Sequence, residues 1–151
     1  MYKRILVPVD GSETAMFGLH EAIRLAKNQR ATLRLFHVVN DFLMIASPEA
    51  AVFSHELLKN FRDRGEAVLA DAASLARKQG LEPETKWVEA LSGPAGAAIV
   101  EQATSWPADL IVLGTHGRRG FRRLVMGSDA EYVVRTTPVP VLLVRGTKAV
   151  P

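Results

Sequence analysis

The sequence predicts a single-domain α/β fold, a doubly wound, five-stranded parallel sheet with helices on both faces. Short apolar runs alternate with segments of helical periodicity, which gives the order β-α-β-α-β-α-β-α-β. The run DLIVLG (109–114) has no polar alternation, as expected of a central parallel strand that is covered on both faces. A length of 151 residues with 48% hydrophobic residues suits one domain with its own core, spanning 1–151.

In the first half of the chain, strands and helices are separated by clear capping signals. Leu19 and Ile23 recur at helical spacing, and Ser12 or Asp10 can cap the helix that contains them. Gly80 is a typical residue for the end of the long helix that follows. The predicted elements here are strand 3–9, helix 13–28, strand 31–39 and helix 48–79.

The second half continues the alternation. The strand ETKWVEA is polar, which favours a position at an edge of the sheet. Gly93-Pro94 opens the next helix and Trp106-Pro107 ends it. The predicted elements here are strand 84–90, helix 93–106, strand 109–114, helix 128–136 and strand 139–145.

Two strand orders are common for such a sheet, and the loops favour one of them. Ligands bind beyond the carboxyl ends of the strands, where the strand order reverses. In the order 3-2-1-4-5 that point joins the loop VDGS (9–12) to the stretch GTHGRRGFRRLVMGS (114–128). In the flavodoxin-like order 2-1-3-4-5 the crevice would instead receive ALSGPAG, which carries no charge to hold an anion. We therefore expect a Rossmann-like sheet of order 3-2-1-4-5.

The stretch 114–128 has the composition of a phosphate-binding loop. It contains four glycines and four arginines and no carboxylate. Glycine lets backbone N–H groups approach an anion closely, and the start of the next helix at Ser128 adds free N–H donors. Ser128 can also cap that helix, and the arginines can simply be solvated. Neither a GxxxxGK[ST] loop nor a GxGxxG turn after the first strand is present.

Asp10 is an acidic residue that is expected to lie across the crevice from the stretch 114–128. A carboxylate repels bare phosphate, but it suits a ribose hydroxyl or a Mg²⁺ ion that is bound together with phosphates. The plain alternative is that Asp10 is a cap or turn residue. The chain has no cysteine, so disulfides and thiolate chemistry are excluded. It has no apolar run of the length of a signal peptide or membrane span, so we expect a soluble cytoplasmic protein.

The chain resembles the universal stress protein family. The spacing Gly114-x2-Gly117-x9-Gly127-Ser128 is similar to the nucleotide-binding pattern of the ATP-binding branch of that family. The blocks RILVPVDGSETA, LFHVV and DLIVLGTHGRRGFRRLVMGSDAEYVVRTTPVPVLLVR extend the resemblance over most of the chain. It departs from the pattern at Asp129, whose carboxylate is expected to compete with phosphate for the N–H groups of the helix.

The resemblance implies a homodimer, stress-linked regulation and an adenine-nucleotide site. Our leading hypothesis is therefore a regulatory protein that binds an adenine nucleotide, acts on an unknown partner and turns over ATP slowly at most. ATP, ADP or AMP would be the ligand, with Mg²⁺ bound through Asp10. Adenine and ribose would lie near the first strand and Val39, and the phosphates near the glycines. The candidate nucleotide-binding residues are Pro8, Val9, Asp10, Val39, Leu113, Gly114, Thr115, His116, Gly117, Arg118, Arg119, Gly127, Ser128 and Asp129.

Two alternatives to a regulatory protein remain. A weak ATPase or phosphotransferase would need a base, and His116 is the only histidine near the predicted site. A nucleic-acid binder would use the arginines, but the loop offers only Phe121 for stacking on bases. No catalytic residue is therefore assigned, and we expect neither nucleic acid nor membrane as a partner.

The homodimer is expected to form through the last strand, Val139 to Val144. In the predicted order this strand is an edge, and the run VLLV (141–144) is apolar and uninterrupted. Pro138 and Pro140 protect only its start. A two-fold axis would pair the strand with its own copy, whereas the alternative is that the tail GTKAVP covers the edge.

Overall fold

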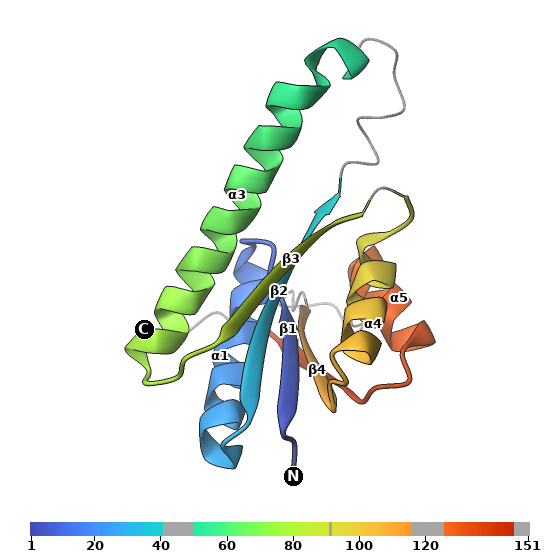
Figure 1. Ribbon diagram of the computed structural model, residues 1–151. Coiled ribbons are helices and arrows are strands. Elements are labelled where there is room, and N and C mark those ends of the chain that lie inside the picture. Colours follow the sequence, from blue (N-terminus) through green and yellow to red (C-terminus); the bar gives the residue numbers. More distant parts are fainter. Residues whose placement is uncertain (41–49, 91, 116–125, 147–151) are drawn as a thin grey trace.

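The protein is a three-layer α/β sandwich, seen in a computed structural model that describes residues 1–40, 50–90, 92–115 and 126–146 (Figure 1). The strands are β1 (Arg4–Pro8), β2 (Thr32–Asn40), β3 (Glu84–Ala90), β4 (Leu110–Thr115) and β5 (Val141–Arg145). The helices are α1 (Glu13–Gln29), α3 (Ala50–Lys78), α4 (Ala95–Ser105) and α5 (Ser128–Thr136). These elements follow the predicted order with boundaries that differ by a few residues.

The five strands form one parallel sheet in the order β3-β2-β1-β4-β5. The predicted order 3-2-1-4-5 is confirmed, and the flavodoxin-like alternative is wrong for this chain. The polar strand β3 lies at one edge, as its composition indicated, and β5 lies at the other. Because the order reverses between β1 and β4, the crevice for a ligand opens beyond the carboxyl ends of these two strands.

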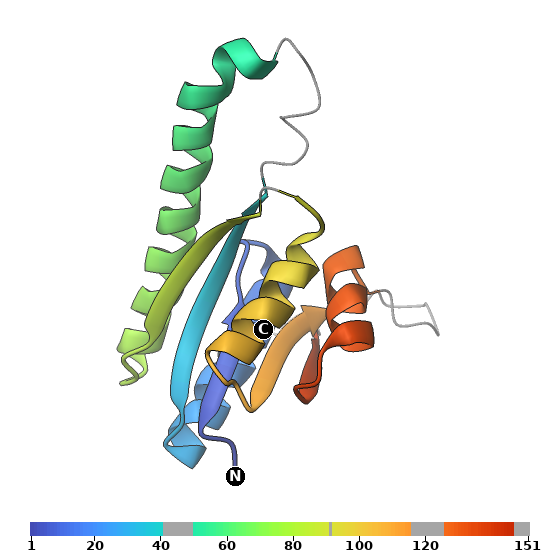
Figure 2. The same ribbon diagram turned by 45° about the vertical axis from the view of Figure 1, so that its right-hand side comes forward.

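Helices cover both faces of the sheet, as Figures 1 and 2 show. Side chains of β1 alternate between the two faces, so that Ile5 and Val7 pack against α1 and α3 while Leu6 faces α4 and α5. All three side chains are fully buried. A strand that is buried on both faces has no polar side to show, which explains the continuous apolar runs of β1 and β4 in the sequence.

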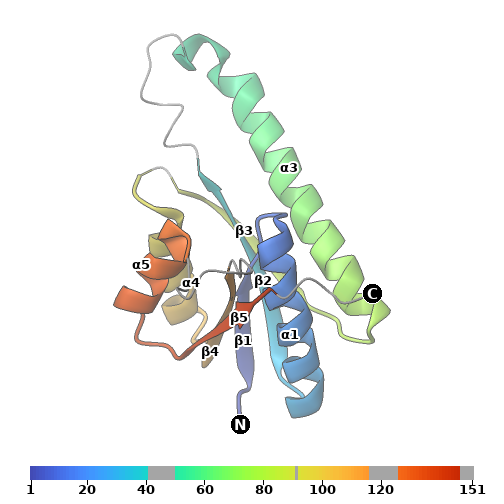
Figure 3. The same cartoon turned by 180° about the vertical axis from the view of Figure 1, so that it is seen from behind.

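Helix α1 begins at a cap that the sequence predicted. The Ser12 hydroxyl accepts a hydrogen bond from the Ala15 amide at 3.1 Å, and Ser12 is the N-cap residue. Just after the C-terminus of the long helix α3, Gly80 takes a positive φ of 79°, which favours glycine at this position. Viewed from behind, α3 runs past the end of the sheet at its N-terminal half, and β5 lies close to α1 (Figure 3).

Candidate functional site

A cavity of about 250 Å³ opens where the crevice was expected, beyond the carboxyl ends of β1 and β4. Segments from both halves of the chain contribute to it, since the turn after β1, the middle of β2 and the starts of α4 and α5 all reach it. The described lining residues are Pro8, Val9, Asp10, Ser12, Thr14, Ala15, Phe36, His37, Val38, Ala95, Ile99, Leu113, Gly114, Gly127, Ser128, Asp129 and Ala130.

Asp10 is both a turn residue and a wall of this cavity. Its Oδ1 atom accepts a hydrogen bond from the Ser12 amide at 2.9 Å, which fixes the turn that leads from β1 into α1. Within the part of the chain that the structure describes, Oδ2 has no hydrogen-bond partner. The alternative role as a turn residue is therefore confirmed, and it leaves one carboxylate oxygen available to a ligand.

The N-terminus of α5 supplies hydrogen-bond donors to the same cavity. Gly127 is the N-cap residue, and its carbonyl accepts from the Glu131 amide at 2.9 Å. The preceding amides, those of Ser128, Asp129 and Ala130, have no acceptor among the described residues, as is usual in a first helical turn. Of the two roles that the sequence left open for Ser128, capping does not apply, because Ser128 is the first helical residue, as predicted, and Gly127 is the N-cap.

The Asp129 carboxylate lies on α5 but accepts a hydrogen bond from α4. Its Oδ1 accepts a hydrogen bond from the Gly96 amide at 3.0 Å, in the first turn of α4. The N-cap of α4 is Pro94, which provides no side-chain hydrogen bond, so Asp129 caps α4 from outside. This oxygen serves the amide of α4, and the expected weakening of phosphate binding by the Asp129 carboxylate stays a prediction.

The two described glycines of the predicted loop have different roles. Gly114 lies within β4, and a Cβ atom there would come within 1.8 Å of the Thr14 carbonyl oxygen. Helix α1 therefore packs directly on the backbone of β4. A Cβ atom on Gly127 would have no neighbour within 4 Å. Its backbone φ of −67° is also open to any residue, so Gly127 is not required by the fold.

His37 lines the cavity, although it was not among the site residues predicted from the sequence. Its Nδ1 atom lies 2.7 Å from the carbonyl oxygen of Val9. A carbonyl can only accept, so Nδ1 carries the proton and donates it. The other edge of the ring faces Gly65 of α3, where a Cβ atom would lie 2.6 Å from Cδ2. His37 thus holds the end of β1 in place from β2.

Of the remaining predicted site residues, some do not line this cavity, and others are not among the residues that the structure describes. Val39 is absent from the described lining and faces a neighbouring cavity of about 210 Å³, which shares Asp10, His37 and Val38 with the first. Thr115 is buried and is also absent from that lining. His116, Gly117, Arg118 and Arg119 lie outside the described residues.

The described residues offer neither a cluster of metal ligands nor a membrane-spanning helix. They contain no group of three or more His, Cys, Asp or Glu residues arranged to hold a metal ion. None of the described helices combines the length and the hydropathy that crossing a bilayer requires.

The chain matches a known protein family over almost its whole length. The model of the universal stress protein family matches residues 1–145. The chain belongs to the universal stress protein family. This confirms the family that the three sequence blocks indicated.

Curated universal stress proteins match along almost the whole chain. One from Methanocaldococcus jannaschii is 34% identical over 149 residues, which cover 98% of this chain and 85% of that protein. One from Thermus aquaticus is 36% identical over 148 residues, covering 96% and 100% of the two chains. Among solved structures, a universal stress protein from Lactobacillus plantarum has a TM-score of 0.79 at 29% identity, covering 95% of this chain and 98% of that one.

Several solved universal stress proteins with this fold contain an adenine nucleotide. One structure holds cAMP, at 24% identity and a TM-score of 0.64. A second, from Archaeoglobus fulgidus, holds dAMP, at 24% identity and a TM-score of 0.67. A third, from Arabidopsis thaliana, has AMP bound, at 16% identity and a TM-score of 0.69. At these identities the likeness establishes the shared fold.

Proposed function

We propose that this universal stress protein binds an adenine nucleotide in the crevice between β1 and β4 and acts as a homodimeric regulator in the stress response. The observation that carries the proposal is the pairing of two opposite features across one cavity. A carboxylate oxygen of Asp10 faces it from one side, and the amide donors at the start of α5 face it from the other.

The parts of a nucleotide match these features one by one. The free oxygen of Asp10 accepts from a ribose hydroxyl, or binds Mg²⁺ held together with phosphates. The amides of Ser128, Asp129 and Ala130 donate to phosphate oxygens, and the positive end of the helix dipole favours an anion there. The apolar walls at Val9 and Val38 are suited to a flat base. The cAMP, dAMP and AMP complexes of other family members support the choice of adenine.

The polar side chains of the cavity each hold a backbone group in place. Oδ1 of Asp10, Oδ1 of Asp129 and Nδ1 of His37 make these contacts. The second oxygen of Asp10 is given a binding role in this proposal, toward a ribose hydroxyl or Mg²⁺. We propose that ATP is a bound ligand that is hydrolysed slowly at most, and ATP turnover that is lost in Asp10→Ala would contradict this.

Calorimetry with ATP, ADP, AMP and GTP, each with and without Mg²⁺, tests the proposal. We expect adenine nucleotides to bind and GTP to bind at least about tenfold more weakly. Asp10→Asn keeps an acceptor for the Ser12 amide but removes the charge, so the gain in affinity that Mg²⁺ provides should vanish. Asp71→Asn, on the exposed surface of α3, is the matched control. Equal binding of GTP and ATP would contradict the proposed specificity.

A homodimer through β5 completes the proposal. Within the described part of the chain, β5 pairs with β4 on one side only, and residues Val141 to Val144 are half-buried. An apolar edge strand of this kind tends to pair with another chain. A two-fold axis would pair two copies antiparallel and leave no free edge for a third chain.

A further inference from the structure

A second cavity, of about 400 Å³, lies between α4 and the strands β2 and β3. Phe36 is the only described residue that also lines the cavity at β1 and β4. The walls are built from small apolar side chains of α4 and from the end of β3. The described lining residues are Phe36, Val88, Glu89, Ala90, Ser92, Pro94, Ala97, Ala98, Glu101, Gln102 and Ser105.

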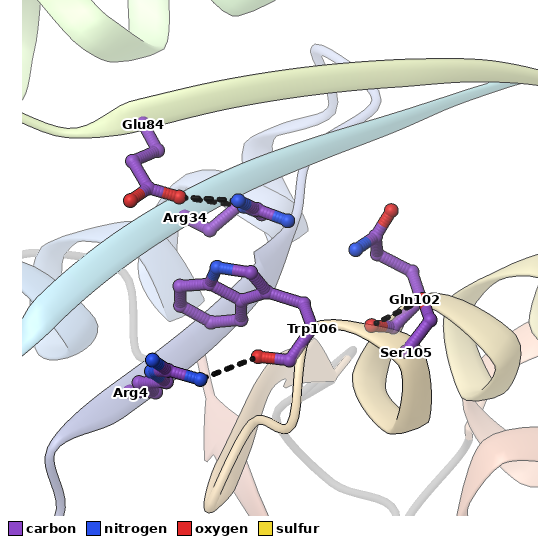
Figure 4. A network of polar contacts seen from close by, with 6 residues as sticks. All are labelled: Arg4, Arg34, Glu84, Gln102, Ser105 and Trp106. Atoms are coloured by element: carbon purple, nitrogen blue, oxygen red, sulfur yellow. Dashed lines mark hydrogen bonds and ion pairs between the residues drawn. The ribbon is translucent and has the colours of Figure 1, made fainter.

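Gln102 places a buried, unpartnered side-chain amide in the wall of this cavity. The residue is only 9% exposed, although a glutamine is usually at the surface. Among the described residues its side-chain amide has no hydrogen-bond partner, whereas its backbone carbonyl accepts from the Trp106 amide at 3.0 Å and from the Ser105 hydroxyl at 3.4 Å. Figure 4 shows the side chain extending from α4 away from Ser105. Buried side-chain donors and acceptors are usually hydrogen-bonded, so both ends of this amide are available to a ligand.

The charges around this cavity exclude an anion. Its described lining contains the carboxylates of Glu89 and Glu101 and no lysine or arginine. Glu89 is paired with Arg62 of α3, whereas Glu101 is exposed and has no ion pair among the described residues. Nearby Arg34 is also occupied, because it is stacked on the Trp106 ring at 4.3 Å and bonded to Glu84 at 2.9 Å (Figure 4). Phosphates are therefore disfavoured here.

We propose that this cavity binds a small planar molecule that carries a primary carboxamide and is uncharged or cationic. A carboxamide offers a donor and an acceptor side by side, so it can pair with both atoms of the Gln102 amide. The apolar walls at Val88, Ala97 and Ala98 then cover the flat body of the molecule. The carboxylate of Glu101 favours a positive charge on that body. The site is separate from the proposed nucleotide site and does not depend on it.

Three matched probes separate the amide from the charge. Nicotinamide is neutral, 1-methylnicotinamide is a cation and nicotinate is an anion of nearly the same shape. We expect nicotinamide to bind with a dissociation constant in the millimolar range and nicotinate to bind at least about tenfold more weakly. The cation should bind at least as tightly as nicotinamide. The readout is a set of amide shifts in two-dimensional NMR that centre on Ala97, Ala98 and Gln102.

Four variants test which residues of this cavity bind the probes. Gln102→Leu keeps the volume and should weaken both amide probes by at least about fivefold. Ala98→Leu keeps Gln102 but fills the cavity, and it should abolish binding even if Gln102→Leu proves unstable. Glu101→Gln should remove the advantage of the cation and leave nicotinamide unchanged, while Glu21→Gln, on α1 at the opposite face, should change nothing. Binding of nicotinate as tight as that of nicotinamide, shifts that map elsewhere, or no binding of nicotinamide up to its solubility would overturn the proposal.

Discussion

Gly114 of β4 and Thr14 of α1 are in such close contact that a Cβ atom on Gly114 would lie 1.8 Å from the Thr14 carbonyl oxygen. Gly18 completes the contact from the helix, because its own Cβ would come within 2.8 Å of the Gly114 amide nitrogen. The first glycine of the family's loop pattern is therefore a packing residue. It lets α1 approach β4, and this approach places the turn at Asp10 beside the strand that leads into the loop.

Alanine substitutions at the two described glycines of the pattern should separate their roles. Gly114→Ala forces α1 away from β4, and we expect it to lower the free energy of unfolding by about 1–3 kcal/mol or more, as overpacking does. Gly127→Ala places its Cβ in open space, so we expect a loss below about 1 kcal/mol. Urea denaturation of both variants measures the difference. Equal losses would show that Gly114 is not held by this contact.

The Asp129 carboxylate should matter more for α4 than for its own helix. Asp129→Ala removes the only side-chain acceptor that the described residues give the Gly96 amide, so we expect a loss of about 0.5–2 kcal/mol of stability, as for an N-cap. Asp129→Asn keeps an acceptor for this amide and should retain most of the stability.

The same pair of variants measures the effect of this charge on nucleotide binding. Both remove a negative charge beside the proposed phosphate position, so both should bind ATP more tightly than the wild type does, by a few-fold at low salt. AMP should gain less, because it carries less charge. Weaker ATP binding in Asp129→Asn would mean that the carboxylate contributes to the ligand site directly.

Much of this fold was predictable because its signals are local. Helical and strand periodicity indicated the order of the elements. The continuous apolar run of β4 placed this strand inside the sheet, and the polar run of β3 placed that strand at an edge. The roles of Gly114, Asp129 and His37 were not predictable. Their partners are backbone groups of Thr14, Gly96 and Val9, which belong to other elements, and a glycine that packs reads the same in the sequence as a glycine that binds phosphate.

The site itself was predicted in part. The two segments that the sequence placed across the crevice, the turn at Asp10 and the start of α5 at Gly127, do meet at one cavity. Phe36 and Val38 of β2 and Ala95 and Ile99 of α4 carry no signal in the sequence, because they are ordinary apolar side chains. Gln102 was missed for a related reason, since only its burial distinguishes it from a surface glutamine.

The fit between His37 and Gly65 can be tested by a double-mutant cycle. In the wild-type background Gly65→Ala places a Cβ within 2.6 Å of the His37 ring, which we expect to cost about 1–3 kcal/mol of stability. In the His37→Ala background this clash is gone, and alanine in place of a helical glycine should instead gain up to about 1 kcal/mol. Thermal unfolding of the four proteins gives the coupling. Additive effects would mean that the ring moves aside freely.

The proposed dimer requires backbone N–H and C=O groups on the edge of β5 that faces away from β4. In the parallel ladder the Pro140 carbonyl accepts from Ile111 and the Gly146 amide donates to Thr115, so even-numbered residues of β5 point their backbone groups at β4. The amides of the odd-numbered residues, including Arg145, therefore face the free edge. Arg145 is exposed, so its side chain can be changed without disturbing the core.

Arg145→Pro should break the dimer and leave the protomer folded. Proline removes one outward N–H from the edge that would pair with the second copy, while the ladder to β4 keeps its hydrogen bonds. Arg145→Ala removes the same side chain and keeps the N–H, so it separates the backbone effect from the loss of charge. We expect analytical ultracentrifugation to find dimers of the wild type and of Arg145→Ala at micromolar concentration, and a dissociation constant raised at least about tenfold in Arg145→Pro. If the wild type sediments as a monomer at a hundredfold higher concentration, or if the proline variant dimerises as tightly as the alanine variant, the two copies do not pair through β5.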